Sequence, residues 1–196
     1  MRKIVGIILI VAMSILCFGC SNKESQDPIK VEMTVREYGV ITFELYPDKA
    51  PITVDNFVKL AESGFYDGMR IHRVQQNFVI QGGNPQLVGK SAVPTIKGEF
   101  AANGVKNDLE HMKGALSMAR QGNDYNSASS QFFICSGDCR SSLDGKYACF
   151  GYVVSGMNVV DMINSKAASS AQMGMIENVA DMPIIDSVKV IRNQEG

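Results

Sequence analysis

Arg73 and Gln81 have the most evident chemical potential in this sequence, because they lie among apolar residues of a strand-like run. The run 70–81 also contains Phe78 and Val79. If it forms two strands, these side chains cannot all face a core, since burying a guanidinium without a partner is costly. Some of them must line an outward-facing groove. An arginine there would place a permanent positive charge and a rigid set of hydrogen-bond donors beside apolar surface.

A second strand-like run lies later in the chain and alternates in the same way. Gln131, Phe133 and Cys135 fall on one face of this strand, and Phe132 and Ile134 fall on the other. A glutamine beside a phenylalanine on an exposed face suits a half-apolar binding surface. The pattern also fits an ordinary amphipathic strand with a surface phenylalanine, and the residues alone favour that simpler interpretation.

Both runs resemble the active-site signature of the cyclophilins, the peptidyl-prolyl cis-trans isomerases. The first reads IHRVQQNFVIQGG over 71–83, and the second reads SQFFIC over 130–135. Further matching segments are VDNF (54–57), GALSMA (114–119), LDGKY (143–147), FG (150–151) and GMNVVD (156–161). The resemblance extends over residues 30–192. It implies a mainly β fold, a closed eight-stranded antiparallel β-barrel capped by two α-helices, with the substrate groove on its outer wall.

The resemblance also implies roles for individual residues. The catalytic arginine corresponds to Arg73, and Gln81 would hydrogen-bond the substrate and steady that arginine. The proline pocket corresponds to Phe78, Val79, Phe133 and Leu143, and the other substrate-binding positions correspond to Ala119, Arg120, Gln121, Gln131 and Tyr147. No cofactor and no metal is implied. The sequence likewise contains no GxSxG, Walker or dinucleotide-binding pattern.

Several positions depart from the family pattern. Val79 stands where a methionine is common, and 119–121 reads Ala-Arg-Gln instead of Ala-Asn-Ala. Tyr147 stands where many eukaryotic members have histidine, and Ser142 replaces the tryptophan that favours cyclosporin binding. Catalysis is expected to persist despite these changes, whereas strong cyclosporin sensitivity is not expected.

Alternating apolar residues predict the strands that must position these side chains. Segments 31–35 and 40–45 predict a β-hairpin around a turn at 37–39. Further strands are predicted at 70–74, 78–81, 114–118, 131–135, 147–153 and 184–191. Apolar residues at helical spacing from Val54, ended by Gly64, predict one amphipathic helix, and a shorter one is predicted at 159–164. Many strands with two helices favour a helix-capped barrel over a parallel α/β sheet.

The N-terminal residues predict export. Residues 1–19 combine a basic start with an apolar core too short to span a membrane comfortably, and a small residue precedes Cys20. This pattern resembles a lipoprotein signal peptide, although Cys17 stands where leucine is preferred. We therefore expect lipidation of Cys20, a tether over 20–29, and an isomerase domain over 30–194. Secretion and retention as an uncleaved anchor remain open, and all three alternatives place the domain outside the cytoplasm.

The charge of the mature chain excludes one class of partner. Removal of Arg2 and Lys3 leaves 17 of the 19 basic residues against 20 acidic ones, a net charge near −3. This balance lacks the basic excess of a nucleic-acid-binding protein. We expect a monomer attached to the membrane only through the N-terminal lipid.

The cysteines and histidines favour a structural interpretation. Cys135, Cys139 and Cys149 are an odd number, so a disulfide is disfavoured, although the first two could pair across a sharp turn. His72 adjoins Arg73 and so points to the opposite face of its strand, and the sequence shows no acidic partner for His111. A metal site made from His72, His111, Cys135 and Cys139 is disfavoured because neither a CxxC nor a paired histidine spacing is present.

Two functional classes follow from the resemblance. The first is an enzyme, a peptidyl-prolyl cis-trans isomerase (EC 5.2.1.8) that acts on proline-containing segments of exported proteins. The second is a proline-peptide binding module or holdase chaperone on the same fold. Joint retention of Arg73, Phe78, Gln81 and Phe133 favours the enzyme.

Overall fold

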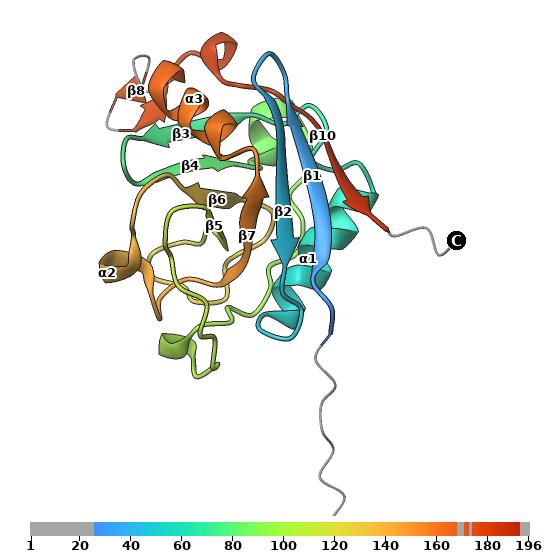
Figure 1. The fold of residues 1–196 in the computed structure, drawn as a ribbon, viewed down its shortest axis with the longest axis vertical. Coiled ribbons are helices and arrows are strands. Elements are labelled where there is room, and N and C mark those ends of the chain that lie inside the picture. Colours follow the sequence, from blue (N-terminus) through green and yellow to red (C-terminus); the bar gives the residue numbers. More distant parts are fainter. Residues whose placement is uncertain (1–25, 168–170, 173, 193–196) are drawn as a thin grey trace, which may run out of the picture.

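The computed structural model describes residues 26–167, 171–172 and 174–192. Its strands form one antiparallel sheet in the order β10-β1-β2-β7-β5-β6-β4-β3-β9-β8 (Figure 1). The strands are β1 Ile29–Val35, β2 Gly39–Leu45, β3 Ile71–Gln75, β4 Val79–Gly82, β5 Ala115–Met118, β6 Phe132–Cys135, β7 Cys149–Ser155, β8 Ala171–Gln172, β9 Met175–Ile176 and β10 Ile185–Ile191. The helices are α1 Pro51–Glu62, α2 Arg140–Leu143 and α3 Met157–Ala167, with short 3₁₀ segments η1 Pro85–Val88, η2 Ala101–Asn103 and η4 Val179–Asp181.

The eight predicted strands are all present, each within two residues of its expected bounds. The two predicted helices are α1 and α3, both longer than expected. Gly64 follows α1 with φ of +68°, which confirms it as the residue that ends this helix. The sequence did not predict the pair β8 and β9, because two residues are too few to show alternation. It did not predict α2 either, because four residues make only one helical turn and cannot show a helical spacing.

The expected closed eight-stranded barrel is wrong. The sheet has ten strands and is open, because no strand ladder in the described part of the chain joins β10 to β3. The segments next to these strands meet at one isolated bridge between Arg70 and Ile184. Three backbone hydrogen bonds flank it, from Ile71 N–H to Pro183 O at 2.9 Å, from Ile185 N–H to Met69 O at 2.8 Å and from Gly68 N–H to Ile185 O at 2.8 Å. Proline has no N–H to donate, so Pro183 cannot continue this ladder. The sheet therefore curls toward closure without completing it.

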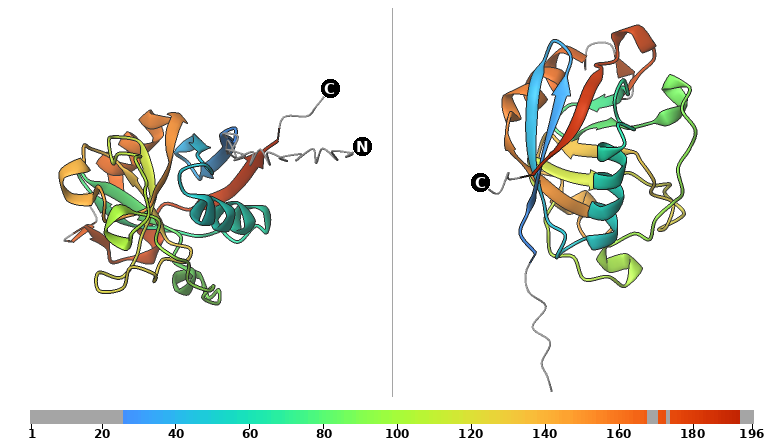
Figure 2. Two further views of the ribbon diagram at one scale, coloured as in Figure 1. Left: turned by 90° about the horizontal axis from the view of Figure 1, so that it is seen from below. Right: turned by 90° about the vertical axis from the view of Figure 1, so that its right-hand side faces the viewer.

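The central strands β4, β5 and β6 have apolar residues on both faces of the sheet, and the two faces pack against different parts of the chain. One face, with α1 and α3, encloses the main core, in which Phe57, Phe132 and Phe150 pack edge to face or tilted. Figure 2 shows α1 lying along one side of the sheet. The opposite face of β4, β5 and β6 carries a smaller apolar cluster that includes Val79 and Phe133. The central strands are therefore buried from both sides. Residues from the loops and from α2, among them Leu109 and Leu143, belong to the second cluster or pack against it.

A distant carboxylate caps the first turn of α1. Ala50 offers no side-chain cap, and Pro51 occupies the first helical position. Glu99 instead accepts hydrogen bonds from Ile52 N–H at 3.1 Å and from Thr53 N–H at 2.8 Å. The Thr53 hydroxyl donates to the same carboxylate at 2.7 Å. The negative charge of Glu99 also interacts favourably with the positive end of the helix dipole. Through these bonds Glu99 attaches the long 83–112 connection to the N-terminus of α1.

Replacing Glu99 with glutamine should lower the free energy of unfolding by about 2 kcal/mol, because the carboxamide loses the charge and turns a donor toward helix N–H groups. Urea unfolding at neutral pH measures this loss. Asp55→Asn on the same helix is the matched control, since Asp55 pairs with Lys59 on an exposed surface and should cost at most about 0.5 kcal/mol. Equal losses in both variants would contradict the capping role of Glu99.

Candidate active site

A row of paired residues crosses the outer face of the sheet. Arg73 of β3 pairs with Gln81 of β4, Gln81 pairs with Phe133 of β6, and Phe133 pairs with Ser117 of β5. Directly paired residues on neighbouring strands point to the same face, so these side chains lie side by side. The predicted assignment of faces in β6 is confirmed, because Phe133 and Cys135 belong to the outer cluster and Phe132 belongs to the main core.

Neutral side chains hold the guanidinium of Arg73. Its Nη1 donates to Gln81 Oε1 at 3.3 Å, and its Nη2 donates to Gln75 Oε1 at 2.9 Å. The Phe78 ring lies 5.8 Å from the guanidinium carbon. Carboxamide oxygens and an aromatic face orient a cation without cancelling its charge. No carboxylate within the described ranges pairs with Arg73, which therefore presents a fixed, uncompensated positive charge to the groove.

Gln81 links the arginine to the opposite wall of the groove. Its Oε1 accepts from Arg73, and its Nε2 donates to Gln131 Oε1 at 3.0 Å. The three side chains form a directional hydrogen-bond chain, which fixes the orientation of the Gln81 carboxamide. This arrangement suits the expected role of Gln81 in steadying the arginine.

One cavity of about 380 Å³ gathers most of the predicted site residues. They come from β3, β4, β6, the segment after β5 and the segment around α2. The lining residues are Arg73, Phe78, Val79, Gln81, Ala119, Arg120, Phe133, Leu143 and Tyr147. Phe133 and Leu143, which form the floor of the cavity, are only 4% and 7% exposed, so this floor is well packed and apolar. A cavity of this size, with an apolar floor and polar side chains around it, can hold a small hydrophobic ring.

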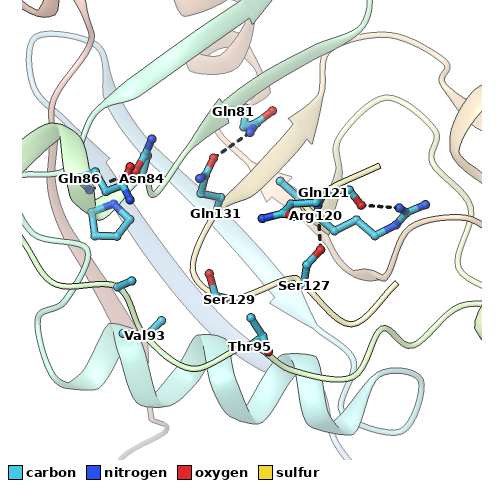
Figure 3. Close-up of a pocket in the computed structure, with 13 residues that line it drawn as sticks. Gln81, Asn84, Gln86, Val93, Thr95, Arg120, Gln121, Ser127, Ser129 and Gln131 are labelled. Carbon is cyan, nitrogen blue, oxygen red and sulfur yellow. Dashed lines mark hydrogen bonds between the residues drawn. The ribbon is translucent and has the colours of Figure 1, made fainter. Parts of the chain in front are cut away.

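Gln121 and Gln131 lie outside this cavity and line a neighbouring one of about 410 Å³, drawn in Figure 3. Gln81, Ala119 and Arg120 border both cavities, so the two form parts of one groove. The far side of the second cavity consists of 84–86, 92–93 and 95. Sequence reasoning did not identify these residues, because they lie in an irregular connection without periodicity or motif.

A buried polar network supports the cavity floor from beneath. His111 Nδ1 lies 2.8 Å from Asp144 Oδ1, and His111 Nε2 lies 3.0 Å from Ser117 Oγ. The His111 ring stacks on Phe133 with a centroid distance of 6.1 Å. The sequence showed no acidic partner for His111, and that expectation is corrected here, because Asp144 comes from a segment distant in the chain. Leu143, a residue of the floor, adjoins this aspartate.

The network has the residue types of a hydrolytic Ser-His-Asp triad but not its accessibility. Ser117 has no exposed surface, whereas a nucleophilic hydroxyl must reach the reacting carbonyl. Burial lowers the pKa of His111, and the hydrogen bond and charge of Asp144 partly oppose this shift. The network is therefore suited to fixing Phe133 and not to covalent chemistry.

The remaining histidine and the three cysteines within the described residues are buried. His72 is 4% exposed and lines neither cavity. Cys135, Cys139 and Cys149 are free and buried, and burial raises the pKa of Cys149 to about 12. Among the described residues, no group of three His, Cys, Asp or Glu side chains is placed to hold a metal ion. No helix in the same ranges is long and apolar enough to cross a bilayer.

Comparisons with known proteins agree with this geometry. Residues 30–190 match the family model for cyclophilin-type peptidyl-prolyl cis-trans isomerases. A peptidyl-prolyl cis-trans isomerase of Acinetobacter baylyi is 42% identical, with 78% of this chain and 80% of that protein covered. Peptidyl-prolyl cis-trans isomerase A of Dickeya dadantii is 40% identical, with 79% and 80% covered.

A solved structure shows the same fold. A cyclophilin-type isomerase from Cryptosporidium parvum superposes with a TM-score of 0.72 at 27% identity, covering 85% of this chain and 99% of that one. The chain therefore belongs to the cyclophilin family. It is a peptidyl-prolyl cis-trans isomerase, as the family and its named homologues establish.

Stability should decrease as the pH falls below about 6.5. Burial lowers the pKa of both His72 and His111, so below 6.5 the unfolded chain takes up protons that the folded chain does not, and unfolding is favoured. For each histidine, the free energy of unfolding should fall by at most about 1.4 kcal/mol per pH unit. Urea unfolding at pH 7.5 and 5.5 tests this.

Other shifted groups titrate outside that window. The pKa values of Asp108 and Asp138 are lowered from 3.8, and those of the buried thiols are raised from 9.0. His72→Gln and His111→Gln should each make the pH dependence shallower. A stability that is equal or greater at pH 5.5 in the wild type would contradict the prediction.

Proposed function

We propose that the groove catalyses rotation about X-Pro bonds with Arg73 as its catalytic residue and Gln81 as its partner. The observation that carries this proposal is the uncompensated guanidinium at the edge of an apolar cavity. Arginine remains charged at any physiological pH, so this arrangement needs no titration to become active.

The chemistry requires stabilisation of a twisted amide. An X-Pro bond rotates over a barrier of roughly 18 to 20 kcal/mol, because rotation destroys amide resonance. In the twisted state the proline nitrogen regains a lone pair, which a cationic donor can approach. Arg73 then binds this state more strongly than either planar ground state, which lowers the barrier. A reduction of about 7 kcal/mol would accelerate rotation roughly 10⁵-fold.

The cavity would hold the proline ring while the preceding carbonyl rotates. Phe78, Val79, Phe133 and Leu143 give it apolar walls, and Gln81 would fix the neighbouring peptide group. Ala119, Arg120, Gln121 and Gln131, with Tyr147 at the rim, would contact the residues that flank the proline. The cyclophilin of C. parvum has also been solved in the presence of the dipeptide Ala-Pro, which supports a proline-containing segment as the ligand here.

Arg73→Ala should lower kcat/KM at least tenfold, equivalent to about 1.4 kcal/mol of transition-state stabilisation, while peptide binding changes little. The measurement is isomerisation of a proline-containing peptide by the full-length chain in a nonionic detergent. Arg36→Ala is the matched control, because Arg36 forms its ion pair with Asp186 outside both cavities.

The same assay separates the enzyme from a proline-peptide binding module or holdase. A binding module would show little turnover in the wild type. An Arg73→Ala chain with full turnover would contradict the assigned role of this residue.

We also propose that the enzyme works on exported proteins outside the cytoplasm, held at the cell membrane by a lipid on Cys20. The support is the sequence pattern of residues 1–20, which lie outside the described residues. The tether over 20–29 would give the domain some freedom above the membrane, and the partners would be proline-containing segments of newly exported chains. A monomer without nucleic-acid partners suits this role.

Cys20→Ala should abolish incorporation of radiolabelled fatty acid into the chain and release the domain from the membrane fraction. The wild type should be labelled and should sediment with membranes. Cys139→Ala is the control for nonspecific acylation, because Cys139 is buried and should leave labelling unchanged. Labelling of the Cys20→Ala chain at the wild-type level would overturn the proposed anchor.

A further inference from the structure

Arg120 is held rigidly at the border between the two cavities. Its Nε donates to Lys146 O at 3.0 Å, and its Nη1 donates to Gln121 O at 2.8 Å and to Gly122 O at 3.1 Å. Figure 3 shows the bond to Gln121. The guanidinium carbon lies 5.3 Å from the centroid of Phe100, 4.9 Å from that of Tyr125 and 4.6 Å from that of Tyr147. Three backbone carbonyls and three rings therefore fix this side chain.

These contacts orient the cation but leave its charge uncancelled. Carbonyl oxygens and aromatic faces attract a guanidinium without carrying a compensating charge. By contrast, Arg36, Arg140 and Arg192 each form ion pairs with carboxylates. Arg120 has no carboxylate partner in the described part of the chain, and its Nη2 donates no hydrogen bond there. One end of the guanidinium is thus available to a ligand.

The groove around Arg120 has only positive charges. No aspartate or glutamate lines either cavity, whereas Arg73 and Arg120 do. Of the nearby acidic side chains, Asp144 accepts from His111 N–H and lies against its ring. Asp124 accepts from Asn126 N–H. A mildly acidic protein thus presents a cationic groove, and a carboxylate bound beside the proline would meet two fixed guanidinium groups.

We propose that Arg120 is a specificity-determining residue that selects proline segments with an aspartate or glutamate within two residues of the proline. This inference rests on the proposed function and names its substrate class. The three rings and three carbonyls hold the guanidinium in place before the ligand arrives, so little side-chain entropy is lost on binding. The site is partly open to solvent, which limits the preference for glutamate over glutamine to about threefold to tenfold, decreasing with salt.

The test uses the full-length chain in a nonionic detergent and matched peptides. Glutamate, glutamine or lysine is placed in turn at each of the two positions before and after a single proline. Both the dissociation constant and kcat/KM are measured, at low and at high ionic strength. At one or more positions, the glutamate peptide should bind at least threefold more tightly than the glutamine peptide, and the lysine peptide should bind more weakly than the glutamine peptide. High ionic strength should reduce both differences in affinity.

Variants of Arg120 assign the preference. Arg120→Gln should remove most of it, because only Arg73 is then left to attract the carboxylate. Arg120→Lys should retain a larger part, because the charge remains while the stacking and the fork of donors are lost. Arg36→Gln is the matched control and should leave the preference unchanged. Equal binding of glutamate and glutamine peptides by the wild type at all four positions would overturn the inference, as would an undiminished preference in Arg120→Gln.

The two proposals fail differently. Turnover without any charge preference would remove the specificity role and leave the isomerase intact. Charge-selective binding without turnover would remove the catalytic role of the groove and leave the specificity role of Arg120 in place. The dissociation constants alone decide the specificity question, whatever the turnover.

Discussion

The structure depends on one constraint, which is that a permanent cation must be fixed beside apolar surface without being neutralised. A carboxylate partner would hold Arg73 more tightly but would cancel the charge that the proposed stabilisation of a twisted amide requires. The chain instead uses the carboxamides of Gln75 and Gln81, and Gln131 fixes the orientation of Gln81 in turn. The three glutamine side chains therefore hold the guanidinium in place without neutralising its positive charge.

The same strands serve both the core and the groove. In β6, Phe132 packs in the main core, and the adjacent Phe133 forms the floor of the groove. The outer floor is supported by its own polar network, in which His111 joins Asp144 to Ser117 beneath Phe133. The strand that carries Phe133 is thus anchored in the core by Phe132, which limits movement of the groove floor.

The long irregular connection between β4 and β5 forms the other wall of the groove and is tied down by single polar residues. Glu99 fastens it to the N-terminus of α1. The Asn107 side chain donates to Cys149 O at 2.8 Å, and an isolated bridge joins Ile96 to Ala128. These bonds compensate for the absence of a strand ladder, so a wall with little regular structure can still present a defined surface to a ligand.

The sequence by itself indicated the family through its motifs, the eight strands of four to seven residues and the shared face of Gln131, Phe133 and Cys135. It left open which of Arg73, Phe78, Val79 and Gln81 face outward. Period-two alternation and helical spacing are local properties, so a single chain displays them directly. Only the tertiary structure decided that the sheet stays open near Pro183, that Asp144 meets His111, and that three rings surround Arg120. Each of these features joins segments far apart in the chain, and no local pattern of residues encodes which distant partner a side chain will meet.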